Sequence, residues 1–71
     1  MPEISLLSIR RIMKKAGIQR ASKEAIETLR DIAEEYILQI AKTALELAEH
    51  AKRKTVQKED ITMATKLLGK I

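Results

Sequence analysis

The residues with the clearest chemical potential are three consecutive cations and a hydroxyl: Lys52, Arg53, Lys54 and Thr55. Cations on an exposed helix face recur every three or four residues, so an unbroken run of this kind indicates a short connection between two helices. Positive side chains, a hydroxyl and the free backbone amides of a helix junction are donors that bind phosphate groups. This basic cluster therefore predicts a surface that binds a polyanion, and DNA is the first candidate.

Other kinds of chemistry have little support in this sequence. The chain has no cysteine and one histidine, His50, so neither a disulfide nor a zinc site is expected, and we predict no metal and no cofactor. No carboxylate pair, nucleophile with a matching base or phosphate-cradling glycine loop is recognisable, so we predict no catalytic residue and no enzyme. No apolar run approaches the roughly 20 residues of a membrane span, and no signal-peptide pattern opens the chain. We therefore expect a soluble, intracellular protein.

The charges are segregated along the sequence, although the net charge is only +4. Residues 1–20 carry five cations and one acid, residues 21–49 three cations and seven acids, and residues 50–71 six cations and two acids. A generic helical protein interleaves its charges, whereas two basic ends around an acidic middle create a local field. This distribution also predicts an anionic partner.

The elements that must position these cations are three helices. Gly17 follows a lysine-rich stretch and predicts the end of a first helix over about 5–15, because glycine is favoured just past a helix C-terminus. Ser22 is a candidate N-cap for a long helix that continues without Gly or Pro to about His50. After the basic cluster, Thr55 can cap a last helix over about 57–68, with Gly69 near its end.

The long helix carries a wide apolar stripe. Its members recur every three or four residues: Ile26, Leu29, Ala33, Tyr36, Ile37, Ile40, Ala44, Leu47, Ala48 and Ala51. A chain of 71 residues buries a modest share of its surface, and two short helices cover only part of a helix this long. We therefore predict an obligate dimer in which the long helices of two copies pair antiparallel. Leu38 lies off the stripe and is expected to be exposed.

With these features in place, the sequence resembles the archaeal histones over nearly its whole length. The resemblance rests on Ile12 to Gly17, on Arg20 and Ser22, and on the string from His50 to Thr55 with Glu59-Asp60-Ile61 after it. Two segments, Ile9-Arg10-Arg11 and residues 49–56, also resemble an arginine-rich eukaryotic core histone. The resemblance implies an all-α histone fold that occupies residues 1–71 as a single domain and forms a handshake dimer.

The resemblance also implies how such a dimer would bind double-stranded DNA. In that family the first loop of one subunit lies beside the second loop of the other, which would set Gln19-Arg20-Ala21 against Lys54-Thr55-Val56 of the partner. Arginines then enter the minor groove, and amides and helix dipoles contact adjacent phosphates. The DNA-binding residues expected on this basis are Arg11, Lys14, Arg20, Lys52, Lys54 and Thr55.

Plainer alternatives exist for three of these residues. Arg20 can be a solvated loop arginine, and Lys14, like Lys15, can be a favourable cation at a helix C-terminus. Thr55 can serve as a helix cap, as a support for Arg20 of the partner, or as both.

Other residues are implied to hold the assembly together. The resemblance pairs Arg53 with Asp60 inside one chain, which would lock the second loop to the last helix. It also places Leu47, His50, Asp60 and Met63 where two dimers meet, with His50 facing Asp60 across the junction. The alternative for His50 is an interaction with its own helix dipole alone.

The predicted function is that of an architectural protein that wraps or compacts duplex DNA largely without sequence specificity. It would act as a homodimer, or as a heterodimer with another histone, and associate with the chromosome (nucleoid) in the cytoplasm. Lys15, Asp31, Leu38 and Thr62 do not reproduce charge pairs that the family uses to stack filament turns, so tetramers or short polymers are expected.

Two other functions compete with this one. The main alternative is a histone-fold protein-interaction subunit of a transcription-factor-like complex, which has no need of the DNA-facing cations. A helix-turn-helix regulator is disfavoured because the central helix is too long and no recognition helix is apparent.

Overall fold

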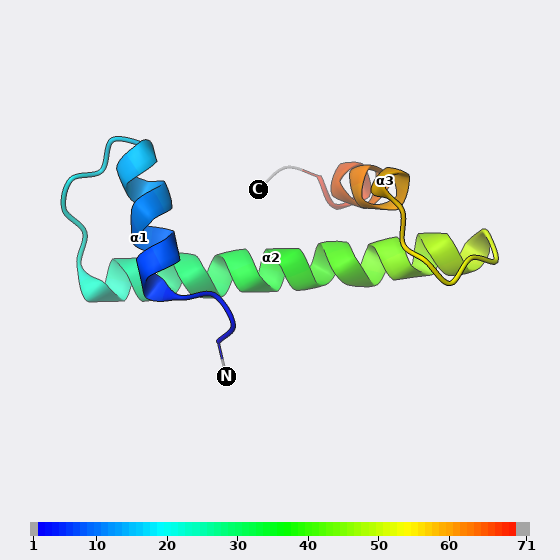
Figure 1. Ribbon diagram of the computed structural model, residues 1–71, viewed down its shortest axis with the longest axis horizontal. Helices are drawn as coiled ribbons and strands as arrows, with labels where there is room; N and C mark the ends of the chain where they lie inside the picture. Colours follow the sequence, from blue (N-terminus) through cyan, green and yellow to red (C-terminus); the bar gives the residue numbers. More distant parts are fainter. Residues whose placement is uncertain (1, 70–71) are drawn as a thin grey trace. The chain divides into compact units, whose positions relative to one another are not determined.

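The computed structural model describes residues 2–69, and this part of the chain contains three helices and no strand. They are α1 (Leu6–Lys15), α2 (Lys23–His50) and α3 (Lys58–Leu68), which follow one another along the chain (Figure 1). The predicted order of a short, a long and a short helix is confirmed. The chain divides into two compact units, Met1–Glu35 and Tyr36–Ile71, and α2 contributes to both.

The first unit is built on an apolar core between α1 and the first turns of α2. Ile9, Met13 and Ile26 are buried there, and Ile4 and Leu6 pack against them. Complete burial of an apolar side chain of this size contributes about 1.5–3 kcal/mol. This small core therefore holds α1 on α2.

Both helices that meet in this core begin with a serine cap. The Ser5 hydroxyl accepts a hydrogen bond from the Ser8 amide at 3.0 Å, and the Ser22 hydroxyl accepts one from the Ala25 amide at 3.0 Å. Each bond satisfies an amide that has no partner within its own helix. The predicted role of Ser22 as the N-cap of the long helix is confirmed.

One carboxylate ties the segment before α1 to α2. Glu34 Oε2 accepts hydrogen bonds from the backbone amides of Glu3 at 2.5 Å and Ile4 at 2.6 Å. Glu34 is half-buried. These two bonds hold the segment in place beside the core, since Ile4 packs against it. We call this arrangement the Glu34 clamp.

The end of α1 is closed by a pair of backbone hydrogen bonds. The Ile18 amide donates to the Met13 carbonyl at 3.0 Å, and the Gly17 amide donates to the Lys14 carbonyl at 2.9 Å. This pattern, the Schellman motif, needs a left-handed backbone at the residue in the position of Gly17. Gly17 has a φ of 94°, which glycine adopts without steric cost. The predicted helix end at Gly17 is confirmed.

The end of α2 is closed by the same motif with a lysine in the glycine position. The Arg53 amide donates to the Ala48 carbonyl and the Lys52 amide to the Glu49 carbonyl, both at 2.9 Å. Lys52 has a φ of 58°, so a side chain with a Cβ occupies the left-handed region. That conformation costs an L residue roughly 1–2 kcal/mol. Nothing in the fold itself requires a lysine at this position.

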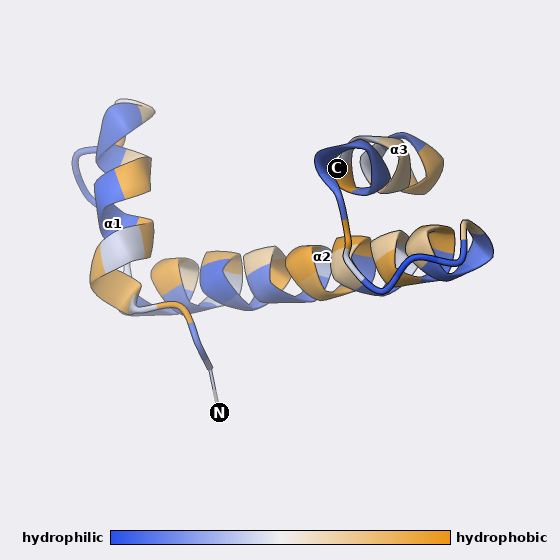
Figure 2. Cartoon of the chain, turned by 45° about the vertical axis from the view of Figure 1, so that its right-hand side comes forward, coloured by the Kyte–Doolittle hydropathy of each residue, from blue (hydrophilic) through white to orange (hydrophobic). Residues whose placement is uncertain are grey.

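Small residues form the core of the second unit. Ala44 and Ala48 of α2 and Ala64 of α3 are completely buried. In both views α3 lies beside the later turns of α2 (Figures 1 and 2). Because alanine side chains are short, two helix backbones can approach closely where they meet.

The start of α3 differs from the prediction. Gln57 is its N-cap, so the proposal that Thr55 caps this helix was wrong. The reason lies in Asp60, whose Oδ2 accepts a hydrogen bond from the Gln57 amide at 2.8 Å. This carboxylate satisfies an amide at the helix start and fixes that start at Lys58. Gly69 ends the helix with a φ of 80°, as expected.

Much apolar surface of α2 remains exposed in a single chain. Figure 2 shows hydrophobic residues along the whole of this helix. Of the predicted stripe, Leu29 is 39% exposed and Ile37 55% exposed, and Ile32 and Leu45, which the prediction omitted, are 53% and 48% exposed. Leu38, predicted to be exposed, has 47% of its surface accessible. The helix therefore presents an apolar surface that α1 and α3 do not cover.

The two Schellman motifs lead to a paired prediction about stability. Lys52→Gly should raise the free energy of unfolding by about 1 kcal/mol per chain, because the gain from relieving the left-handed strain exceeds the cost of a freer unfolded chain. Gly17→Ala should lower it by a similar amount, since a Cβ at this position meets no atom within 4 Å and only the φ of 94° opposes it. Denaturant unfolding followed by circular dichroism at one protein concentration measures both. A destabilised Lys52→Gly variant would contradict this account of the α2 terminus.

Candidate nucleic-acid interface

The basic cluster, residues 52–55, lies in the connection between α2 and α3, as the run of cations predicted. Lys52, Lys54 and Thr55 are exposed, and no described hydrogen bond or ion pair engages these three side chains. The left-handed backbone of Lys52 reverses the chain direction directly after α2. The connection therefore presents two ammonium groups and one hydroxyl to solvent.

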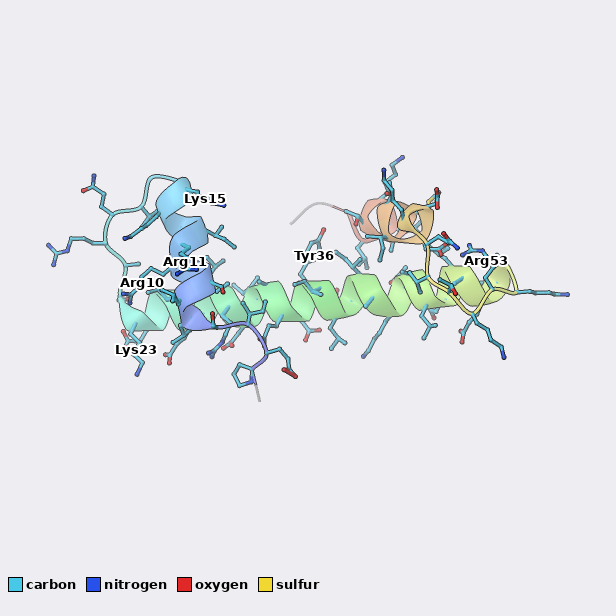
Figure 3. All side chains as sticks on the ribbon, in the orientation of Figure 1. Arg10, Arg11, Lys15, Lys23, Tyr36 and Arg53 are labelled. Atoms are coloured by element: carbon cyan, nitrogen blue, oxygen red, sulfur yellow. The ribbon has the colours of Figure 1, made fainter. Side chains whose placement is uncertain are left out.

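Arg53 is used differently from its neighbours. Its Nη1 donates to Asp60 Oδ2 at 2.8 Å and its Nη2 to Asp60 Oδ1 at 2.9 Å, a two-point contact. Nη1 also donates to the Thr55 carbonyl at 3.1 Å. Figure 3 shows Arg53 in the connection between α2 and α3. Arg53 therefore links the α2–α3 connection to α3 within one chain.

Asp60 is 5% exposed and has both carboxylate oxygens in hydrogen bonds. The hydrogen bonds from Arg53, followed by the bond from the Gln57 amide, lower the pKa of Asp60 from 3.8 to about 2, although burial acts in the opposite direction. The same hydrogen bonds raise the pKa of Arg53 above its usual value. Both carboxylate oxygens of Asp60 are therefore engaged within its own chain. Any contact of Asp60 with a second dimer would have to share these oxygens.

The first unit places another group of cations around the connection between α1 and α2. Lys14 and Arg20 line a hollow of about 330 Å³ together with Arg10. Arg11 does not line this hollow. Figure 3 shows Arg10 and Arg11 on different sides of α1, which follows from the turn of about 100° between consecutive helix residues. Among the expected DNA-binding residues, the fold thus brings Lys14 close to Arg20 and leaves Arg11 apart.

The residues expected between two dimers are distributed over three places in the second unit. Leu47 and His50 line one hollow of about 570 Å³ with Glu46, Glu49, Thr43 and Leu67. Met63 is 47% exposed and lies along α3 in a separate shallow hollow. Asp60 is buried against Arg53. Within one chain, then, only Leu47 and His50 share a surface.

The sequence patterns did not predict the structural roles of several residues. The Glu34 clamp joins positions about 30 residues apart, and no local pattern marks it. The helix-start role of Asp60 was signalled by its place three residues after Gln57, which is the spacing of a capping box. Arg10 was separated from Arg11 by helix geometry, but its place beside Lys14 and Arg20 was not foreseen.

Two kinds of site find no support in residues 2–69. No group of three His, Cys, Asp or Glu side chains there is arranged to hold a metal ion. None of the described helices combines the length and apolar character that crossing a membrane needs.

The Arg53–Asp60 pair predicts how stability depends on acid. A carboxylate with a lowered pKa stabilises the fold fully above its unfolded value near 3.8, and this stability is lost as the pH falls towards about 2. Arg53→Met removes the main cause of the lowered pKa. The unfolding free energies of the wild type and of this variant should therefore differ most above pH 4 and converge towards pH 2. Lys54→Met, which removes an exposed cation one residue away, should follow the wild-type profile. A constant gap between wild type and Arg53→Met would show that the pair does not act through Asp60 ionisation.

Comparisons with known proteins identify the family to which this chain is related. The family described as "Histone-like transcription factor (CBF/NF-Y) and archaeal histone" matches residues 3–65. The chain is 42% identical over 66 residues to one of the subunits of the archaeal histone HAN1 of Thermococcus zilligii, and the match covers 93% of this chain and 98% of that protein. It is 45% identical over 64 residues to "Probable archaeal histone 3" of Methanocaldococcus jannaschii, covering 90% and 96% of the two chains.

A eukaryotic relative is also similar over most of the chain. The "Histone H4" of Encephalitozoon cuniculi is 38% identical over 66 residues, which is 93% of this chain and 64% of that protein. The resemblance to archaeal histones and to a eukaryotic core histone, inferred from sequence motifs, is thereby confirmed. With three helices in the expected order and a family match over most of its length, the chain belongs to the family of histone-like transcription factors (CBF/NF-Y) and archaeal histones.

Proposed function

We propose that this protein is an architectural histone that binds and compacts duplex DNA, largely without sequence specificity, as a single histone-fold domain acting in dimers. The observation that carries the proposal is the exposure of unengaged cations around both helix connections, in a chain related to archaeal histones. Cations and hydroxyls of this kind contact phosphates and carry no base-reading pattern. Such a protein associates with the chromosome.

The dimer is supported by the apolar surface of α2. Leu29, Ile32, Ile37 and Leu45 leave large apolar side chains in contact with solvent in a single chain. Pairing of α2 with α2 of a second copy, or of another histone, covers these residues. We propose the handshake arrangement that the histone resemblance implies.

That arrangement supplies a DNA site made by two chains. The 16–22 connection of one protomer would lie beside the basic cluster of the other, so that Arg20 meets Thr55 of the partner. The Thr55 hydroxyl suits this role because Gln57, and not Thr55, is the N-cap of α3. Lys52 and Lys54 would contact phosphates, Arg20 would enter the minor groove, and Arg11 would contact DNA from the exposed side of α1.

Association of dimers is proposed to use the hollow that contains Leu47 and His50, with His50 facing Asp60 of the other dimer and Met63 adding apolar contact, as the histone resemblance implies. Glu46 and Glu49 line the same hollow, and no cation does. In a two-fold contact between identical dimers the same surface meets itself, so acids would approach acids. This repulsion weakens every contact between dimers, so we expect assembly to stop at tetramers or short polymers.

The alternative function is a histone-fold interaction subunit in a transcription-factor-like complex, a class that the family description includes. The two functions differ in their use of the exposed cations. An interaction subunit would pair with a different chain and would not need Lys54, Arg20 and Arg11 to bind DNA.

The dimer is tested by a pair of adjacent substitutions. Ile37 and Leu38 are similarly exposed in one chain, at 55% and 47%, but only Ile37 lies on the predicted stripe. Ile37→Lys should raise the dimer dissociation constant at least roughly 100-fold, because each copy loses about 2 kcal/mol of apolar burial. Leu38→Lys should leave it nearly unchanged. Sedimentation equilibrium measures both constants. Equal effects of the two substitutions would contradict pairing through the stripe.

DNA binding is tested with a random-sequence duplex over a series of salt concentrations. The wild type should bind with a strong salt dependence and protect DNA from nuclease in regular length steps. Lys54→Gln should reduce the slope of log K against log salt by about 2 in a homodimer, because each copy loses one phosphate contact. Lys42→Gln removes a cation from the acidic middle of the chain and should leave the slope unchanged. A wild type that protects no DNA at moderate salt would favour the alternative function.

A further inference from the structure

The hollow beside α1 gathers three cations and no acid. Arg10 and Lys14 come from α1, and Arg20 comes from the connection to α2. The remaining lining residues are neutral: Met13, Ile18, Gln19, Ala21 and Ile26. Met13 and Ile26 belong to the buried core, so the cations surround a partly apolar floor.

Nothing within the described residues explains why these cations lie together. There, no hydrogen bond or ion pair engages the side chains of Arg10, Lys14 or Arg20, and all three residues are exposed. Two like charges four residues apart on a helix destabilise it by a few tenths of a kcal/mol. An anion placed among the three side chains removes this repulsion. The grouping therefore points to an anionic ligand.

The geometry of α1 assigns Arg10 to this group and separates it from Arg11. Residues four apart lie on the same side of a helix, which joins Arg10 to Lys14 and Arg11 to Lys15. In Figure 3, Arg10 is on the side of α1 nearer the connection to α2, and Lys15 points to the other side. The four cations of α1 thus form two pairs with different surroundings.

We propose that Arg10 and Lys14 hold one phosphate group of the DNA backbone in this hollow, next to the minor groove that Arg20 enters in the proposed function. Arg10 is then a DNA-binding residue of α1 beside the first loop, and Arg11 serves a separate surface of α1. This inference rests on the proposed function, because it takes the duplex to reach the first loop. A guanidinium offers several donors in a fixed plane, so Arg10 and Lys14 can share the oxygens of one phosphate.

The test compares two substitutions that each remove one positive charge, one from the hollow and one from the acidic middle of the chain. With a random-sequence duplex, Arg10→Gln should reduce affinity about tenfold at 0.1 M salt and lower the salt slope by about 1–2 in a homodimer. Lys42→Gln should leave both quantities nearly unchanged. Circular dichroism and sedimentation confirm that each variant keeps its helices and its dimer. Equal effects of the two substitutions would overturn the assignment of Arg10.

Double variants test whether the cations share one phosphate. Because Arg10 and Lys14 would contact the same group, their combined loss of binding free energy should be smaller than the sum of the separate losses. Arg10→Gln combined with Arg11→Gln should be additive, since those residues serve different surfaces. Additivity of Arg10 with Lys14 would overturn the shared site.

A last experiment tests whether the ligand is a phosphate of the DNA backbone or a free phosphate ion. The duplex-binding results then show whether a failure concerns this inference alone or the proposed function as well. Titration with inorganic phosphate to about 10 mM, followed by amide NMR, should give no saturable shift at residues 17–21, because a lone phosphate lacks the neighbouring DNA contacts. Saturable shifts that Arg10→Gln abolishes would replace DNA by a small phosphate ligand. If the wild type binds no duplex, the proposed function fails. If it binds and Arg10→Gln behaves like Lys42→Gln, only this inference fails.

Discussion

The central constraint on this molecule is a helix with more apolar surface than its own chain can cover. α2 has 28 residues, and the two shorter helices have 10 and 11. Ile26 is the largest side chain that is fully buried, and the second unit buries only alanines and Asp60 among its described residues. Such small cores hold α1 and α3 against α2, but they contribute little free energy to the stability of the whole chain. The proposed dimer would cover the remaining apolar surface of α2, and the proposed DNA surface depends on the same second chain.

Neighbouring cations of the basic cluster make different interactions. Arg53 directs its donors to Asp60 and to the Thr55 carbonyl, so it contributes to the fold. Lys52 accepts a left-handed backbone where glycine would be easier, which is consistent with a use for its ammonium group. Lys54 and Thr55 remain exposed and outside any helix cap. One loop thus combines an internal ion pair with the outward groups proposed for DNA.

The helices could be predicted because their signals are local. Ser22 and Gly17 act through hydrogen bonds that span a few residues, and the apolar stripe of α2 repeats with the helix period. The cap of α3 was misassigned because Thr55 and Asp60 both suit a helix start, and only the folded backbone shows which of them is used.

Contacts between distant positions could not be predicted in this way. No sequence period relates Glu34 to Glu3, and none brings Arg10 to Arg20. The family resemblance supplied the expectation that Arg53 meets Asp60, because that contact depends on the loop path more than on any local preference. For the residues proposed to contact DNA, the sequence predicted the chemical type of each side chain, and the fold showed which of them lie together.

The Glu34 clamp has a consequence for mutational tolerance at the beginning of the chain. Its carboxylate accepts from the backbone amides of Glu3 and Ile4, and these bonds do not depend on the side chains at those positions. Evolutionary drift at position 3 is therefore compatible with the clamp, and drift at position 4 is limited only by packing against the core. Proline is the exception, because it has no amide hydrogen to donate. Position 34, by contrast, has to supply a long acceptor, so one residue in the middle of the chain restricts variation far more than the segment it holds.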